Sequence, residues 1–245
     1  MIKCTFDGGF EFNKVHGFYG LHSMYPSDFY EDKGQTLEGT KYWLFIDIPE
    51  EIGKRKHEVK LAKKKGIKII SLFYDESRFP FVDKLVDEKL IDKFILFDKK
   101  YQNRFPIDTF ISDFYVDESV FPLFNKDKNG KMCYFGNRLF DKVLPKDCKY
   151  IRGKNLKELY EIACIHSKGY VPSTGKGENG GIGYQNKAKF IEMILCGLKT
   201  ECQKGIETIN YEKYKNKKIT EDDIKEICKI NIKVRHDIFK QITSL

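Results

Sequence analysis

A chain of 245 residues with 41% hydrophobic and 14% aromatic residues can fill one large or two small cores, which excludes a largely disordered protein. The formal net charge is +8, and no long basic run carries it. Two explanations fit this charge: lysine-rich helix faces exposed to solvent, or a polyanionic partner such as nucleic acid or a phosphorylated substrate.

The seven cysteines are spread through apolar segments, with no CxxC pair and no His/Cys cluster of zinc-binding spacing. This distribution predicts a reducing cytoplasm and no metal site. The first residues, MIKCTFDGG, carry no apolar signal sequence, and no apolar run is long enough to span a membrane. We therefore expect a cytoplasmic protein without a membrane partner.

The first half alternates short strand-like runs with helical periodicity. Runs rich in β-branched and aromatic residues predict strands at 2–6, 41–48, 67–73, 92–97 and 109–114. The spacing of apolar residues predicts helices over 51–65 and 81–90. Because strands and helices that alternate in this way build an open parallel sheet, we expect a Rossmann-like lobe over 1–118.

One segment of this lobe lacks clear periodicity. Residues 10–39 are rich in aromatic side chains and glycine, which predicts mostly loop with one short helix at most. The segment contains His16 and His22. A long irregular segment after the first strand is often functional, and the alternative is an aromatic-packed surface loop.

A charged stretch that contains Pro122 and ends in Asn129-Gly130 breaks the alternation, so we expect a linker over 119–129. A second lobe follows over 130–220. Its predicted strands are 131–135, 148–151, 169–172 and 198–202, and its predicted helices are 138–144, 156–167 and 187–196. A terminal helix is expected over 221–245, with an N-cap region at Thr220.

Residues 169–205 combine a strand, a glycine-rich loop and an amphipathic helix. Glycines let a backbone approach a ligand closely. The helix after the loop points its free N–H groups and positive dipole end into the same space. The stretch therefore predicts a phosphate site, with Glu192 as the carboxylate for a ribose. A flexible turn and an exposed helix carboxylate are the alternatives.

The order of motifs from about 130 to 205 resembles the nucleotide-sugar-binding lobe of GT-B glycosyltransferases. The motifs are KMCYFGNR, then YIRGKNLKELYEIACIHSKGYVPS, then ENGGIG followed by KFIEMILCGLKTE. The resemblance implies an α/β fold of two small Rossmann-like lobes, with a cleft between them and a C-terminal helix that returns to the first lobe. The small size is similar to that of phage enzymes that glucosylate DNA.

Carried over by position, the resemblance implies donor-binding roles for nine residues. Arg138 and Lys189 would contact the diphosphate, with Lys142 as a weaker candidate, and Glu192 would accept hydrogen bonds from ribose hydroxyls. The residues implied near the donor sugar and phosphates are Ser173, Glu178, Gly180, Gly181 and Gly183. The alternative for Arg138 and for Lys189 is an ordinary surface charge.

Two positions depart from the family pattern. Retaining members often carry two glutamates eight positions apart, but counting back from Glu192 gives Tyr184. Leu198 stands where the family usually has proline. The first departure leaves open whether the transfer retains or inverts the anomeric configuration.

An inverting transfer needs a base for the acceptor proton. Asp7 and Asp47 rank first because both follow predicted strands, and His16 comes next. His22 and Asp113 are weaker candidates, and each of these residues taken alone is more often structural. The sequence has no D-x-D motif, so nothing in it demands a metal.

The resemblance implies a glycosyltransferase that moves a sugar, with glucose expected, from a nucleotide sugar, with UDP expected, to an acceptor hydroxyl. The charge suits double-stranded phage DNA as acceptor, through hydroxymethylcytosine or an already glucosylated base, in the cytoplasm of a host. The alternatives are transfer to a surface saccharide, a non-catalytic nucleic-acid-binding protein with two lobes, and a periplasmic-type small-molecule binder. The missing signal sequence argues against the last.

Overall fold

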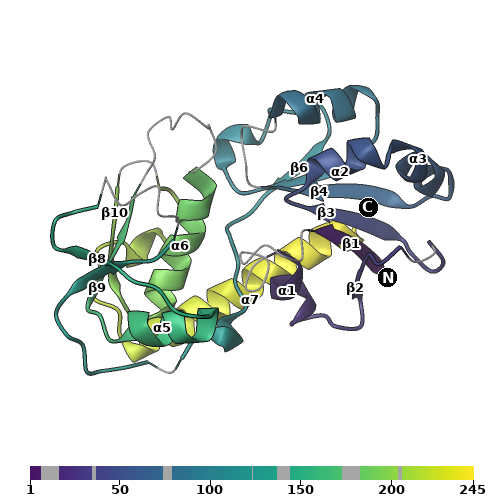
Figure 1. Ribbon diagram of the computed structural model, residues 1–245. Coiled ribbons are helices and arrows are strands. Elements are labelled where there is room, and N and C mark those ends of the chain that lie inside the picture. Colours follow the sequence, from purple (N-terminus) through teal and green to yellow (C-terminus); the bar gives the residue numbers. More distant parts are fainter. Residues whose placement is uncertain are drawn as a thin grey trace. The chain divides into compact units, whose positions relative to one another are not determined.

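The computed structural model describes residues 1–6, 17–34, 37–73, 79–122, 124–136, 144–172, 183–203 and 206–245, with side chains at 183–186 excepted. The chain is α/β and divides into two compact units, each built on its own parallel sheet (Figure 1). Met1–Asp117 and Val234–Leu245 belong to the first unit, and the described residues from Glu118 to Lys233 belong to the second.

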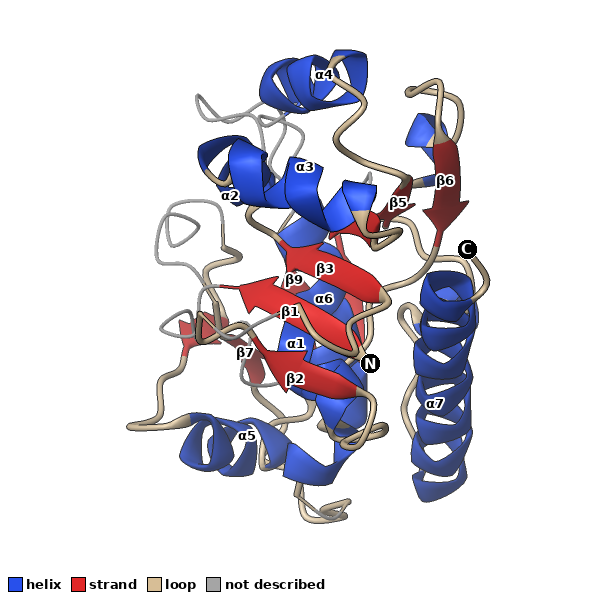
Figure 2. Cartoon of the chain, turned by 90° about the vertical axis from the view of Figure 1, so that its right-hand side faces the viewer, coloured by secondary structure: helices blue, strands red, loops and turns tan. Residues whose placement is uncertain are grey.

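The sheet of the first unit has six strands in the order β2-β1-β3-β4-β5-β6, and all neighbouring strands are parallel. β1, β2 and β3 lie side by side and point the same way (Figure 2). The strands are β1 (Ile2–Phe6), β2 (Phe29–Glu31), β3 (Tyr42–Ile46), β4 (Lys68–Leu72), β5 (Lys93–Leu96) and β6 (Asp108–Ile111). Five of these strands confirm sequence predictions.

Most of the described residues in segment 10–39 are turns and loops, as predicted, and the strand in it was not predicted. The segment contains α1 (Gly17–His22), which is the expected short helix, and the edge strand β2. Ile2 of β1 faces Phe29 of β2 on one side and Tyr42 of β3 on the other. A three-residue strand is too short to show a period of two, so only its pairing with β1 defines it.

Helices cover both faces of this sheet (Figure 1). On one face, Trp43 and Phe45 pack into a core with side chains of α2 (Pro49–Lys54), α3 (Lys56–Lys64) and α4 (Phe79–Asp87). The alternate strand residues are also buried, as expected for central parallel strands. They face α1 and the C-terminal part of α7 (Glu221–Thr243).

The prediction of one continuous helix over 51–65 was wrong. The helix is interrupted at Arg55, which ends α2 and precedes α3 with φ −99° and ψ 23°. Gly53 weakens the helix just before this point. The guanidinium of Arg55 also forms an ion pair with the carboxylate of Asp32, which follows β2. The helical spacing of apolar residues continues through Arg55, so the sequence pattern alone does not show the break.

The second unit has four parallel strands in the order β10-β9-β7-β8. They confirm the four predicted strands, and they are β7 (Met132–Tyr134), β8 (Cys148–Tyr150), β9 (Lys168–Val171) and β10 (Lys199–Cys202). Helices α5 (Leu156–Cys164) and α6 (Gly183–Leu195) match two predicted helices. The third, predicted at 138–144, falls largely outside the described residues. Short 3-10 turns are η3 (Lys99–Tyr101), η4 (Glu118–Val120) and η6 (Glu212–Tyr214).

The predicted N-cap of α7 is confirmed and has the reciprocal bonds of a capping box. The backbone N–H of Asp223 donates to Thr220 Oγ1 at 3.2 Å, and the N–H of Thr220 donates to Asp223 Oδ2 at 2.9 Å. Near the other end, the buried Lys93 ammonium donates to the Gln241 carbonyl at 3.1 Å.

Among the described residues, no helix is both long and apolar enough to cross a membrane.

Candidate functional site

The carboxyl edge of the second sheet is the expected ligand edge of an open parallel sheet. β7 leads there into Phe135 and Gly136, and β8 leads into Arg152 and Gly153. Helix α6 begins at Gly183, after the segment that joins it to β9. The described part of the candidate site therefore consists of two strand exits and the first turns of α6.

Three polar side chains meet beside this edge. The Lys189 ammonium lies 2.8 Å from Glu192 Oε1 and 2.7 Å from Glu192 Oε2. The hydroxyl of Tyr160 on α5 donates to Glu192 Oε2 at 3.1 Å. The same ammonium lies 5.5 Å from the ring centre of Phe135, directly after β7. We call Lys189, Glu192 and Tyr160 the α6 cluster.

Local periodicity explains the α6 cluster. Lys189 and Glu192 are three positions apart on one helix and so share a face. Tyr160 lies on the apolar face of α5, is wholly buried, and stacks on Phe121 with ring centres 4.3 Å apart. The packing of α5 therefore delivers a hydroxyl donor to a carboxylate on α6.

Burial distinguishes the two charged members of the cluster. The Glu192 side chain is 0% exposed, whereas that of Lys189 is 21% exposed. A buried carboxylate requires a cation and hydrogen-bond donors, and Lys189 and Tyr160 supply them. Lys189 is therefore the charged member of the cluster whose side chain is partly exposed to solvent. The contact between Glu192 and a ribose stays a prediction that requires Lys189 or Tyr160 to move.

Two glycines shape the strand exits in the motifs that resemble the glycosyltransferase lobe. Gly136 has φ +152°, and a Cβ on it would lie 2.5 Å from the Tyr134 hydroxyl oxygen. The Tyr150 hydroxyl donates to the carbonyl of Gly136 at 2.9 Å. A Cβ on Gly153 would lie 2.3 Å from the backbone nitrogen of Leu159. The positive φ therefore favours glycine at 136, and the close approach of the α5 backbone requires glycine at 153.

Replacing Gly153 by alanine is expected to lower the free energy of unfolding by about 1–3 kcal/mol, because the added methyl group forces α5 away from the strand exit. Urea unfolding followed by circular dichroism measures the change. The exposed neighbour Lys154 provides the control, since Lys154→Ala is expected to stay within about 0.5 kcal/mol of the parent. Equal stability of the Gly153→Ala variant and the parent would contradict the close approach.

Most of the predicted site residues lie outside the described part of the chain. They are Asp7, His16, Arg138, Lys142, Ser173, Glu178, Gly180 and Gly181. Their roles stay predictions. The described candidates are Gly183, Lys189 and Glu192 in the second unit and Asp47 in the first.

Asp47 lies at the carboxyl end of β3. The strand order β2-β1-β3 means that the chain leaves β1 toward one side and resumes on its other side, so the sheet has a switch point between β1 and β3. Asp47 directly follows β3 and has φ 56°, a backbone conformation that is uncommon for residues other than glycine. Its position is the expected one for a ligand-facing carboxylate in this type of sheet.

The described aromatic residues beside the end of β1 form a packed cluster. Phe6 stacks on Phe18 with ring centres 4.5 Å apart, and Phe18 contacts Tyr19 edge-on at 5.2 Å. His22 lies 5.0 Å from the Phe18 ring, so its imidazole belongs to this cluster. The other weak candidate, Asp113, is 4% exposed.

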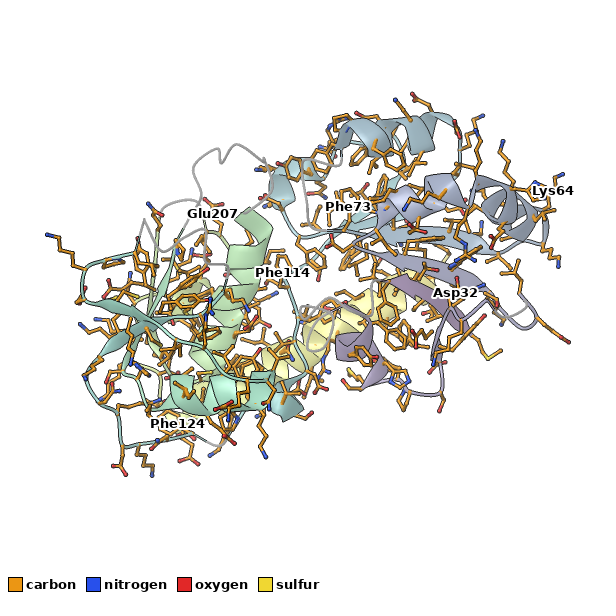
Figure 3. All side chains as sticks on the ribbon, viewed as in Figure 1. Asp32, Lys64, Phe73, Phe114, Phe124 and Glu207 are labelled. Carbon is orange, nitrogen blue, oxygen red and sulfur yellow. The ribbon has the colours of Figure 1, made fainter. Side chains whose placement is uncertain are left out.

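A buried ionic cluster around Asp32, which is labelled in Figure 3, was not predicted for the first unit. Asp32 follows β2, and its carboxylate pairs with Lys3 at 3.0 Å and with Arg55. Thr5 Oγ1 donates to it at 2.9 Å and Gly34 N–H at 3.1 Å. We call Lys3, Asp32 and Arg55 the Asp32 cluster. Because these three residues are far apart in the sequence, no local pattern predicts the Asp32 cluster.

The Asp32 cluster is structural rather than catalytic. Burial acts to raise the pKa of Asp32, but hydrogen bonds from Arg55, Lys3, Thr5 and Gly34 outweigh it and hold the pKa below its usual value. A carboxylate engaged by four donors is not available to accept a substrate proton. The cluster instead joins the end of β2 to β1 and to the break between α2 and α3.

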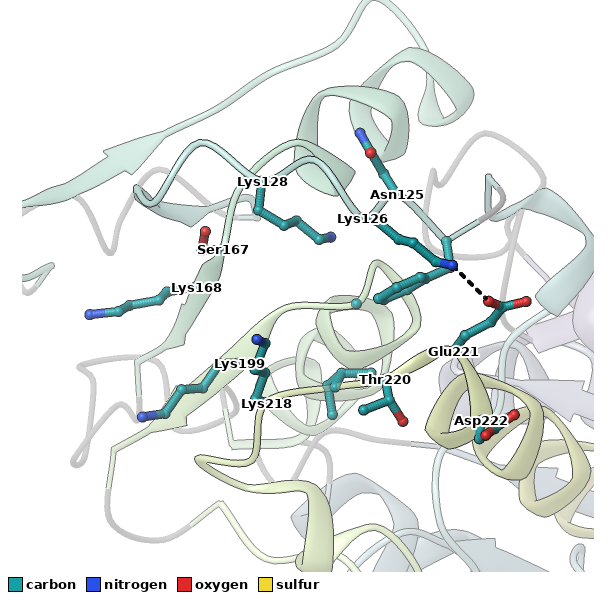
Figure 4. A pocket seen from close by; sticks show the side chains of 13 residues that line it. Asn125, Lys126, Lys128, Ser167, Lys168, Lys199, Lys218, Thr220, Glu221 and Asp222 are labelled. Atoms are coloured by element: carbon teal, nitrogen blue, oxygen red, sulfur yellow. Dashed lines mark ion pairs between the residues drawn. The ribbon is translucent and has the colours of Figure 1, made fainter.

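A pocket of about 800 Å³ lies at the opposite, amino edge of the second sheet (Figure 4). Its lining includes five lysines and the start of α7.

Within the described residues, no group of three or more His, Cys, Asp or Glu side chains is arranged to hold a metal ion. Compared with known proteins, the chain matches no family model, no curated protein and no solved structure.

Proposed function

We propose that this protein is a glycosyltransferase that uses a nucleotide sugar as donor. The observation that carries the proposal is the α6 cluster. It presents a lysine ammonium beside the carboxyl edge of an all-parallel sheet, on a helix that follows a glycine-rich sequence. The order of motifs that resembles the donor lobe of GT-B enzymes supports the same reading. The GT-B arrangement of the two units is part of this proposal.

Lys189 would bind the donor diphosphate. As the sugar carbon forms a bond to the acceptor oxygen, its bond to the diphosphate breaks, and the diphosphate leaves with the electron pair. A fixed ammonium and the positive end of α6 stabilise this developing charge. Glu192 and Tyr160 act as positioning residues because they hold the ammonium in place.

The acceptor hydroxyl must lose a proton to a base. Asp47 is the described candidate, because it lies at the switch point of the first sheet, where a ligand is expected. Asp7 and His16 remain candidates from sequence. We propose glucose and UDP as donor components, and hydroxymethylcytosine or a glucosylated base in phage DNA as acceptor, with a surface saccharide as the alternative acceptor.

Donor profiling tests the proposal. The full chain is incubated with each of a set of UDP- and GDP-sugars, with and without hydroxymethylated DNA, and released nucleotide and thermal stability are measured. We expect one donor to raise the melting temperature and to release nucleotide faster with acceptor. If no donor and no free nucleotide changes the melting temperature, the glycosyltransferase proposal fails.

Lys189→Gln is expected to weaken binding of the effective donor about 10- to 100-fold, the range for losing a charged hydrogen bond of about 1.5–3 kcal/mol. Titration calorimetry measures the affinity. Lys189→Arg retains the charge and is expected to recover part of the affinity. Lys157→Gln removes an exposed lysine of α5 as a matched control, and it is expected to bind like the parent. Equal affinities of Lys189→Gln and Lys157→Gln would remove Lys189 from the site.

A further inference from the structure

The lysine-lined pocket lies at the edge of the second sheet opposite the α6 cluster (Figure 4). Lys168 is the first residue of β9 and Lys199 is the first residue of β10, so both mark amino ends of strands. Residues 124–126 and 128 precede β7, and 218–222 lead into α7. The pocket is therefore separate from the proposed donor site.

The sheet register brings two of the lysines together. Lys199 lies directly opposite Lys168 in the pairing of β10 with β9. Like charges at directly opposed positions destabilise a sheet. Lys168, Lys199 and Lys218 form no ion pair with any acidic side chain in the described part of the chain. Three lysines of one pocket therefore have no acidic partner among the described residues.

The acidic residues of the pocket have a separate structural explanation. Glu221 and Asp222 occupy the first turn of α7, where carboxylates complement the helix dipole. They are also paired with lysines: Glu221 lies 3.8 Å from Lys126, and Asp222 lies 3.1 Å from Lys225. With five lysines and these two carboxylates, the lining carries a formal charge of +3.

Lys128 has a structural role in the pocket wall. Its ammonium donates to the carbonyl of Cys164 at 2.7 Å and to that of Cys196 at 3.0 Å, at the C-terminal ends of α5 and α6. A cation at this place stabilises both helix ends. The fold therefore accounts for Lys128, whereas the described residues offer no comparable contact to the ammonium groups of Lys168, Lys199 or Lys218.

We propose that this pocket binds phosphate groups through Lys168, Lys199 and Lys218. Adjacent strands are about 4.8 Å apart, which lets the two paired lysines contact one phosphate or two neighbouring ones. The volume of about 800 Å³ exceeds the needs of a single inorganic phosphate and lies in the range of organic ligand sites. Lysine is a point charge without the planar fork of arginine, which suits phosphates bound without a fixed orientation. The ligand is a free polyphosphate compound or the backbone of a nucleic acid.

The test uses two probes on the full chain: inorganic tripolyphosphate, followed by calorimetry, and a fluorescein-labelled DNA duplex of random sequence, followed by anisotropy over a series of salt concentrations. The pocket variant is Lys168→Gln/Lys199→Gln. The control variant, Lys229→Gln/Lys233→Gln, removes two exposed lysines from α7 and so has the same net charge.

We expect the parent and the control variant to bind tripolyphosphate alike, and the pocket variant to bind it at least tenfold more weakly. If the natural ligand is a nucleic acid, the pocket variant also loses DNA affinity, and the slope of log K against log salt falls by about two. Loss of tripolyphosphate binding alone identifies a free phosphorylated ligand. Both results support the proposal.

Two outcomes would overturn it: the parent binds neither probe, or the pocket and control variants lose affinity equally. Melting temperatures at low salt without ligand check the fold. Removing the opposed charges is expected to leave the melting temperature of the pocket variant equal to that of the parent or higher. This proposal does not depend on the glycosyltransferase assignment, and the pocket variant retains the α6 cluster.

Discussion

Replacing Lys189 by methionine is expected to lower the free energy of unfolding by about 3–5 kcal/mol and to weaken donor binding at least as much as Lys189→Gln does. The wholly buried Glu192 carboxylate would lose the Lys189 ammonium, which contacts both of its oxygens. Removing one member of a buried ion pair is costly because it leaves the other charge uncompensated. Urea unfolding at neutral pH measures the change in stability.

The double variant Lys189→Met/Glu192→Leu separates stability from function. It removes both charges, so we expect it to recover most of the stability lost in the single variant. Donor binding should stay as weak as in the single variant, because the ammonium that contacts the diphosphate is still missing. A double variant that loses the sum of the two single effects would show that the charges are not coupled. A stable double variant that binds donor normally would exclude Lys189 from donor binding.

Replacing Asp32 by asparagine is expected to lower the free energy of unfolding by about 3–5 kcal/mol at pH 7. The side chains of Lys3 and Asp32 are each 2% exposed, so this change removes the negative charge from a buried ion pair. Glu58→Gln is the control, because Glu58 is a 53% exposed partner of Arg55. Exposed ion pairs contribute little, so we expect a change within about 0.5 kcal/mol.

The stability contributed by Asp32 has a defined pH dependence. Its pKa is lowered in the folded protein, so its contribution is fully present above the unfolded value of about 3.9 and is lost as the pH falls through the folded value. The stability difference between the parent and Asp32→Asn should therefore be constant from pH 7 to about pH 5 and shrink below about pH 4. A difference that grows on acidification would contradict the assignment of Asp32 as a charged partner.

Local patterns in the sequence predicted most of the secondary structure. The β-branched run at 67–73 predicted β4, and the spacing of apolar residues predicted α5. The capping residue Thr220 marked the start of α7. These signals were readable because each depends on residues no more than about four positions apart in the sequence.

The candidate site was only partly predictable. Lys189 and Glu192 were chosen from their place on the helix after the glycine-rich loop, and they do share one face of α6. The burial of Glu192 and its bond from Tyr160 were not predictable, because α5 and α6 are separate in sequence and meet only when the unit folds. The roles predicted for Arg138 and for the glycine-rich loop at 173–182 remain expectations from sequence.

The sequence by itself determined the class of this protein, an α/β chain with two parallel sheets, because buried strands and amphipathic helices leave local periodic patterns. Tertiary structure alone decided the rest: the pairing of β2 with β1, the Asp32 cluster, and the register that places Lys199 beside Lys168. Each of these joins residues far apart along the chain. Their proximity results from packing and strand register, for which a single sequence carries no local signal.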